Sequence, residues 1–166
     1  MVMYGGATTS ERRAALEEKI TAARVVQLFD DDGDQVVAGT DLAKLESVFA
    51  DADDIVTGLL LKKGFSVEAL EILATDRQVI RAWAGIVAQL GGERRTEWLD
   101  DQGRGPYDAF GIRARSELQA LARGDIRSVK EVEPGVANTS IVGDVQRGQF
   151  IFTDPNDPTG QGPGGF

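Results

Sequence analysis

Apolar side chains recur at every third or fourth residue between Thr40 and Leu90, in two stretches separated by Lys62-Lys63-Gly64. This spacing places the apolar positions of each stretch on one stripe of a helix. The first stripe consists of Leu42, Leu45, Phe49, Ala52, Ile55, Val56 and Leu59. The second consists of Ala69, Ile72, Leu73, Val79, Ile80, Trp83, Ile86, Val87 and Leu90. Two such stripes can bury each other, so we predict an antiparallel helical hairpin with Trp83 in its core.

Capping residues predict where these helices begin and end. Thr40 is placed to cap the first helix, and Ser66 is placed to cap the second half of the hairpin. A capping-box pattern that starts at Thr75 divides that second half into a short helix over residues 67–74 and a longer one over residues 76–90. The Gly91-Gly92 pair is expected to end the longer helix.

Two further helical segments flank the hairpin. Ser10 is a suitable N-cap for an amphipathic segment that continues, after a break near Thr21, to Phe29. Pro106 suits the first turn of a last helix that stops at Gly124, where glycine is a common C-terminal stop. We therefore expect a flexible N-terminal arm over residues 1–9 and a helical domain over residues 10–124.

The character of the chain changes after residue 124. Ser140–Val145 and Gln149–Thr153 have the composition of two short strands, and a lone two-stranded hairpin is marginal in water. We predict a β-hairpin or assembly arm over residues 125–153 and an extended or disordered Pro/Gly-rich tail over residues 154–166. The predicted fold class is mainly α: a helical bundle built on an antiparallel hairpin, with a short C-terminal β-hairpin or arm and this tail.

Composition excludes several classes of function. The 166 residues include no cysteine and no histidine, which removes disulfides, thiolate catalysis, the commonest general base and the usual transition-metal ligand. The carboxylates are spread along the chain without a convergent pair, so we expect no enzyme and no cofactor. No apolar run is long enough for a membrane span, and the first residues do not resemble a signal peptide.

Net charge is −9, from 27 acidic and 18 basic residues. Such a balance argues against wrapping around nucleic acid, which needs a basic surface. It is compatible with lining a channel through which DNA slides without sticking, because like charges repel. It is equally compatible with a role in solubility alone.

One acidic loop has the spacing of a calcium-binding loop. Asp30, Asp32, Asp34, Val36 and Asp41 correspond to ligand positions 1, 3, 5, 7 and 12 of the twelve-residue loop in a helix–loop–helix calcium site. The pattern departs at position 6, which is Gln35 instead of glycine, and at position 12, where aspartate is shorter than the usual glutamate. The alternative is an acidic turn that ends one helix and caps the next.

Five segments in a fixed order resemble a family of small tailed-phage proteins that includes Mu-like structural proteins and head–tail connector, or head-completion, proteins. The resemblance covers residues 10–153 and contains no catalytic signature. Its segments are Leu28-Phe29-Asp30 with the acidic loop, the run Leu45–Leu60, Arg81-Ala82-Trp83, the last helix with Leu121-Ala122-Arg123-Gly124, and Arg147–Phe152.

The resemblance implies a mainly helical subunit that docks under the portal protein as a homo-oligomeric ring, usually of twelve copies. Such a ring closes the DNA-filled capsid and presents a platform to a tail-side neck or tail-terminator protein. DNA then passes through the lumen without sequence-specific binding. The implied location is the neck of the virion, at the head–tail interface, and the host cytoplasm during assembly.

On this hypothesis the predicted partner-binding residues are Arg147, Phe150 and Phe152 in the arm, with Trp98 and Tyr107 behind them. The arm can exchange between subunits or, alternatively, cover the core of its own subunit. Trp98 likewise can contact a partner or fold back on the core. Two other functions remain open: a tail-completion or other phage assembly protein, and a calcium-responsive helical module built on residues 30–41.

Overall fold

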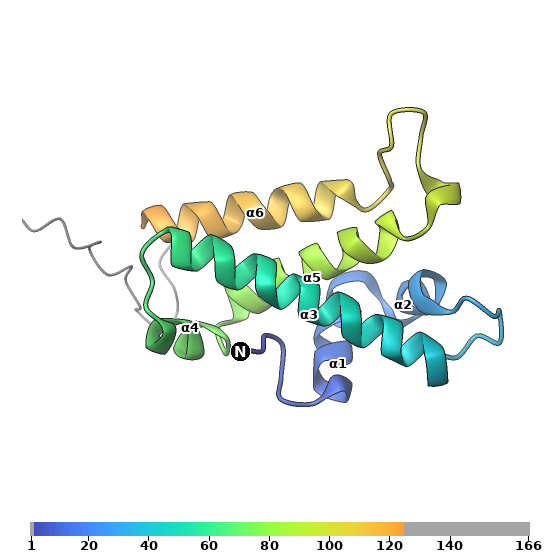
Figure 1. Cartoon of the computed structure of the whole chain (residues 1–166), viewed down its shortest axis with the longest axis horizontal. Helices are drawn as coiled ribbons and strands as arrows, with labels where there is room; N and C mark the ends of the chain where they lie inside the picture. The colour runs from blue at the N-terminus through green and yellow to red at the C-terminus, as the bar shows by residue number, and fades with distance from the viewer. Residues whose placement is uncertain (1, 125–166) are drawn as a thin grey trace, which may run out of the picture. The chain divides into compact units, whose positions relative to one another are not determined.

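The computed structural model describes residues 2–124, and the regular structure in this range is helical (Figure 1). The mainly helical prediction is therefore confirmed for the described part of the chain. The elements are α1 (Thr9–Ile20), α2 (Ala22–Phe29), α3 (Gly39–Lys62), α4 (Val67–Leu73), α5 (Arg77–Glu93), the 3₁₀ turn η1 (Thr96–Trp98) and α6 (Asp108–Arg123). Nothing in this range is long and apolar enough to cross a membrane as a helix.

Helix α5 is the centre of the fold. It packs against α1, α2, α3, α6 and η1, and its most extensive contact is with α6. The seven consecutive residues 82–88 are all buried, because a helix surrounded by others needs apolar or small side chains on every face. Trp83 is fully buried among them, which confirms its predicted core role.

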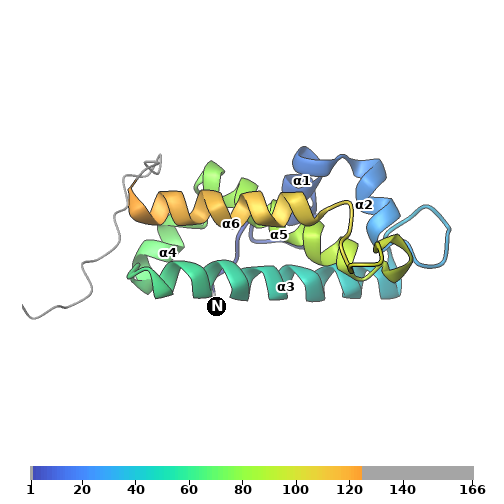
Figure 2. The ribbon, with the colours of Figure 1, turned by 90° about the horizontal axis from the view of Figure 1, so that it is seen from above.

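The two helices on either side of α4 in the chain, α3 and α5, also pack on each other. Figure 2 shows α3 running along one side of the bundle towards α4. Helices α5 and α6 are the next two long helices in the chain. The sequence pattern emphasises α3 and α5, whereas the closest helix pair in the structure is α5 with α6.

Glycines in α5 allow its neighbours to approach closely. A Cβ atom on Gly85 would lie 3.0 Å from the carbonyl oxygen of Phe110, in the backbone of α6. A Cβ atom on Gly91 would lie 2.9 Å from the ring of Phe29, and one on Gly92 would lie 3.0 Å from the ring of Tyr107. The prediction that Gly91-Gly92 ends this helix is wrong, since α5 continues to Glu93 and uses both glycines for packing.

Of the N-cap residues predicted at Ser10, Thr40 and Ser66, one is confirmed and two are wrong. Ser66 caps α4 as predicted, and its hydroxyl accepts an N–H from the first turn. Helix α1 begins earlier than expected: Thr8, and not Ser10, is its N-cap, and Thr8 forms a reciprocal capping box with Glu11. Thr40 does not cap α3, because that helix already begins at Gly39.

The N-terminal segment, predicted to be a loose arm, is packed into the core at Tyr4. This side chain is fully buried, and its hydroxyl lies 3.3 Å from the hydroxyl of Thr57. The backbone N–H of Tyr4 donates to the carboxylate of Asp53, and its carbonyl accepts from Arg12. An aromatic ring that fills a gap in the core anchors the segment, so residues 4–8 belong to the helical domain.

The remaining predicted elements lie outside the described residues. These are the hairpin or arm over residues 125–153 and the Pro/Gly-rich tail over residues 154–166.

Candidate functional site

The acidic loop joins α2 to α3 and so forms a helix–loop–helix unit. Its first position, Asp30, directly follows the end of α2 at Phe29. Its tenth position, Gly39, is the first residue of α3, and the twelfth, Asp41, lies in the first turn of that helix. The eighth position, Val37, is buried in the core. Each of these placements is the one that a twelve-residue calcium loop has relative to its helices.

The carboxylates of the loop accept hydrogen bonds from backbone N–H groups of the same loop. Asp30 accepts from Gly33 at 2.7 Å and from Gln35 at 2.8 Å. Asp32 accepts from the N–H of Asp34 at 3.2 Å. In the same way, the carboxylate of Asp34 accepts from Val36 at 2.8 Å. These hydrogen bonds hold the turns of the loop.

Gln35 takes the backbone conformation that glycine would provide. Its φ angle is +64°, in the left-handed region, and that of Gly33 is +80°. A non-glycine residue pays a steric penalty there, which the hydrogen bond from the Gln35 N–H to Asp30 helps to offset. Position 6 departs from the calcium-loop pattern in sequence, but Gln35 adopts the left-handed conformation there.

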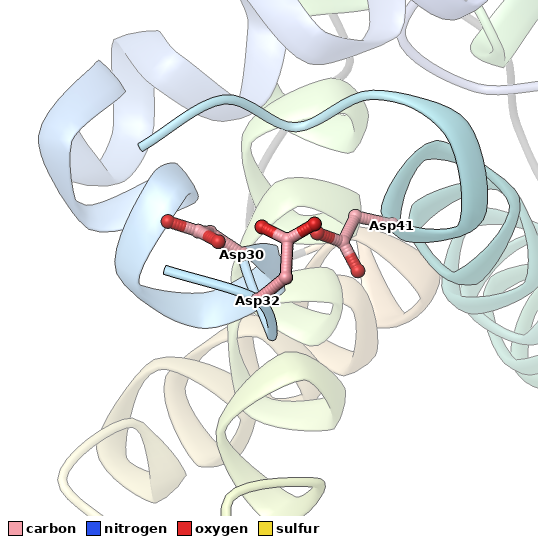
Figure 3. Close-up of side chains that lie close together, drawn as sticks. All are labelled: Asp30, Asp32 and Asp41. Atoms are coloured by element: carbon pink, nitrogen blue, oxygen red, sulfur yellow. The ribbon is translucent and has the colours of Figure 1, made fainter. Parts of the chain in front are cut away.

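Three carboxylates of the loop converge. One oxygen each from Asp30, Asp32 and Asp41 lies within 4.8 Å of the others, and Asp34 is not part of this group. Figure 3 shows the carboxyl groups of Asp32 and Asp41 pointing towards each other, with Asp30 beside them. Asp41 is 3% exposed, so one side of the cluster is closed by the protein. Carboxylate oxygens at this spacing are suitable ligands for a hard divalent cation such as Ca²⁺.

Basic side chains from α3 and from the end of α5 surround the loop. Lys44 binds Asp31 and lies 3.0 Å from a carboxylate oxygen of Asp41. Arg94 and Arg95 also reach Asp31, at 3.2 and 3.0 Å. Asp31 occupies position 2, which is not a ligand position, so the two arginines do not compete for the cluster. Lys44 does compete, because a cation that binds Asp41 must displace its ammonium group.

The pKa values of Asp30 and Asp32 are shifted in opposite directions. The hydrogen bond from the Asp34 N–H lowers the pKa of Asp32, but desolvation, the charges of Asp34 and Asp41 and a hydrogen bond with the Asp30 side chain together raise it above its ordinary value. The pKa of Asp30 is lowered, because the N–H groups of Gly33 and Gln35 stabilise its charged form against desolvation. The crowding around Asp32 is a repulsion that a bound cation would relieve.

Arg95 joins the loop to the aromatic residues of the long connector. Its guanidinium donates to the carbonyl oxygens of Leu28 and Asp30, where α2 ends, and lies 5.9 Å from the ring centre of Trp98. The hydrogen bonds to Leu28 and Asp30 join residues more than sixty positions apart. No local pattern in the sequence indicates the contacts of Arg94 and Arg95. Lys44 is different, because its i,i+3 spacing from Asp41 is a local helical signal that could have indicated it.

The predicted partner-binding residues fall into two groups. Trp98 is half-buried and folds back on the core, with its ring centre 6.3 Å from that of Tyr107. Tyr107 is only 7% exposed and packs against Gly92, so it is a core residue and leaves little surface for a partner. Arg147, Phe150 and Phe152 lie outside the described residues.

Comparison with known proteins gave no match to a family model, a curated protein or a solved structure.

Proposed function

We propose that this chain is a structural subunit of the tailed-phage neck, a head–tail connector that docks under the portal as a ring. The proposal starts from the order of sequence segments that resembles the connector family over residues 10–153. A mainly helical subunit with a buried, anchored N-terminal segment is compatible with it. On this proposal the antiparallel pairing of α3 with α5 is the scaffold, and residues 125–153 form the arm that contacts neighbours.

One observation on the described surface carries the proposal. Six large apolar side chains are exposed within residues 2–124, and three of them, Leu61, Val67 and Ile72, lie at the corner between α3 and α4. Figure 1 shows α4 next to the C-terminal end of α3. Large apolar side chains exposed on adjoining segments of a chain can form a surface for another protein. We assign this apolar corner to contact with a neighbouring virion protein.

The test is to delete the reading frame from a phage that carries it and to examine the particles by electron microscopy. We expect DNA-filled or leaking heads beside separate, complete tails. Normal infectious particles would overturn the proposal. Abnormal tails on intact heads would move the protein to a tail-completion role.

Complementation makes the test specific to the apolar corner. A plasmid copy with Val67→Asp and Ile72→Asp should fail to restore infectious particles, although the isolated protein keeps its helical circular dichroism. A matched control is Ile112→Asp, on α6, which introduces the same change at a side chain that is 67% exposed. The control should restore infectivity.

A second candidate function is a calcium-responsive helical module. It is favoured by the convergence of Asp30, Asp32 and Asp41 in a loop that has the helix–loop–helix register of calcium sites. Calorimetric titration with Ca²⁺ should show binding near one ion per chain. A flat titration curve at low ionic strength would remove this candidate.

A further inference from the structure

The outward face of α3 carries small residues and two carboxylates that have no ion pair in the described part of the chain. We define this outer face by four exposed residues that follow one another at helical spacing: Ser47, Asp51, Asp54 and Gly58. Ser47 and Asp51 also line a cavity with Leu90, Glu93 and Arg94 at the end of α5. Every ion pair recorded for residues 2–124 involves other acidic groups. Within residues 2–124, Asp51 and Asp54 therefore form no ion pair of their own, although Asp51 and Arg94 line the same cavity.

Gly58 is an exposed glycine inside α3. Glycine in a helix destabilises it by roughly 0.5–1 kcal/mol relative to alanine. A Cβ atom added there would meet nothing within 4 Å among the described residues, and its φ angle is not in the left-handed region. Within residues 2–124, neither packing nor backbone geometry therefore requires glycine at this position. A position without a side chain on an exposed helix face does allow close approach by another chain.

A basic groove lies between α1 and α5. It encloses a cavity of about 430 Å³ and is lined by Lys19, Arg77 and Arg81, with Glu18 among them. Ala14, Ala15 and Ile80 supply small and apolar side chains to its lining. A second cavity of about 210 Å³, between α5 and α6, shares Arg81 and continues the groove. A groove of this kind can receive a helix with small outward side chains.

Positive charge remains in the groove after its own ion pairs are formed. Arg77 pairs with Glu18 at 3.0 Å, and Glu117, at the α6 side, pairs with Arg113 at 2.7 Å. Lys19 and Arg81 form no ion pair within the described residues. Burial lowers the pKa of Lys19, and the charges of Arg113 and Arg81 lower it further against the opposing effect of Glu117. A carboxylate from another molecule would relieve this repulsion.

The groove and the outer face of α3 are two different surfaces, since the groove is lined by residues of α1 and α5. Figure 2 shows α3 along one side of the bundle and α1 towards the opposite side. Contact between them is therefore head-to-tail, which closes into a ring when the rotation between copies allows it.

We propose that the outer face of α3 of one copy docks in the basic groove of the next copy, with Asp51 and Asp54 facing Lys19 and Arg81. This inference names the subunit contact of the ring and rests on the proposed connector function. A second copy of this chain is the occupant of the basic groove for two reasons. The charges on the two surfaces have opposite signs, and the absence of a side chain at Gly58 allows close approach.

Charge reversal tests the contact in the full-length chain. We expect sedimentation velocity over a range of protein concentrations to show self-association of the wild type. Lys19→Glu/Arg81→Glu and Asp51→Lys/Asp54→Lys should each weaken it by about tenfold or more, because like charges then meet. The quadruple variant should restore self-association, and so should an equimolar mixture of the two double variants. Glu71→Lys/Asp101→Lys, at exposed positions away from both surfaces, is the matched control and should not weaken it.

Zero-length cross-linking supplies a second readout that captures weak contacts. In a mixture of ¹⁴N- and ¹⁵N-labelled chains, a carbodiimide should join Lys19 of one copy to Asp51 or Asp54 of another, and Lys19→Arg should abolish this product. A chain that stays monomeric and gives no such cross-link would overturn the contact, and so would self-association that is indifferent to the reversals. The deletion phenotype of the phage is independent of these results, so failure of the contact is distinguishable from failure of the connector proposal.

Discussion

Arg12 and Asp53 form a buried ion pair in which one guanidinium nitrogen lies 2.7 Å from both carboxylate oxygens. Arg12 is 9% exposed and Asp53 is 1% exposed. The guanidinium also lies over the rings of Phe49 and Trp83, at 4.7 and 5.1 Å from their centres. The pair ties α1 to α3 beside the central helix, and further hydrogen bonds connect it to the backbone of Tyr4.

Removal of Arg12 alone should destabilise the fold strongly. Arg12→Met leaves the Asp53 carboxylate buried without its partner, which typically costs about 3–5 kcal/mol. Chemical denaturation followed by circular dichroism measures this loss. The double variant Arg12→Met/Asp53→Leu, which leaves no buried charge, should be more stable than Arg12→Met. A loss below about 1 kcal/mol for Arg12→Met would show that the pair does not hold α1 in place.

Stability should fall on the acid side through Asp31. Lys44, Arg95 and Arg94 lower the pKa of this carboxyl, with the hydrogen bond from Lys44 as the largest cause. A lowered pKa in the folded state means that the stabilisation is fully present above the ordinary pKa of aspartate, about 3.9, and is lost as the pH falls through the lower folded value. Asp31→Asn should therefore be less stable than the wild type near neutral pH, and the difference should vanish in acid.

The measurement is the free energy of unfolding of both proteins between neutral pH and strong acid. Asp101→Asn is the control, because Asp101 is exposed in the connector before α6. It should change the free energy of unfolding little at any pH. A wild-type advantage over Asp31→Asn that persists unchanged in acid would contradict the ion-pair explanation.

Local sequence signals predicted the helices well, because amphipathic periodicity and caps such as Ser66 act within a few residues. They predicted the start of α5 to within one residue but ended the helix too early, because the role of Gly91 and Gly92 depends on Phe29 and Tyr107 packing against them. Tyr4 was assigned to a loose arm for a similar reason. Its burial depends on a core assembled from residues far along the chain, and the segment has no periodicity of its own.

The acidic loop was predicted in part. Regular spacing indicated Asp30, Asp32 and Asp41, and these three converge. Lys44, by contrast, lies on α3, and its contact with Asp31 exists only because α3 folds next to the loop. The basic groove could not be predicted from local sequence patterns either, because its residues come from α1 and α5 and meet only in the folded chain.

Two glycines in long helices should respond to alanine in opposite ways. At Gly58 a methyl group meets open space, so Gly58→Ala should stabilise the protein by roughly 0.5–1 kcal/mol. At Gly85 the methyl group would lie 3.0 Å from the Phe110 carbonyl oxygen, in backbone that cannot move without shifting α6. Overpacking of this kind typically costs about 1–3 kcal/mol, so Gly85→Ala should destabilise. Denaturation midpoints of the two variants measure the contrast, and equal shifts would contradict the close packing of α5 on α6.

On the calcium-module proposal, Lys44 should limit the calcium affinity of the loop. Its ammonium group occupies the carboxylate of Asp41, which a calcium ion needs as a ligand. Lys44→Met removes the competitor and its positive charge, so the calcium affinity should rise, on the order of tenfold. Asp32→Asn should lower it, and Asp101→Asn should leave it unchanged. Calorimetric titrations of the four proteins, wild type included, give the comparison. An affinity that does not increase in Lys44→Met would show that the three converging carboxylates do not act as the site.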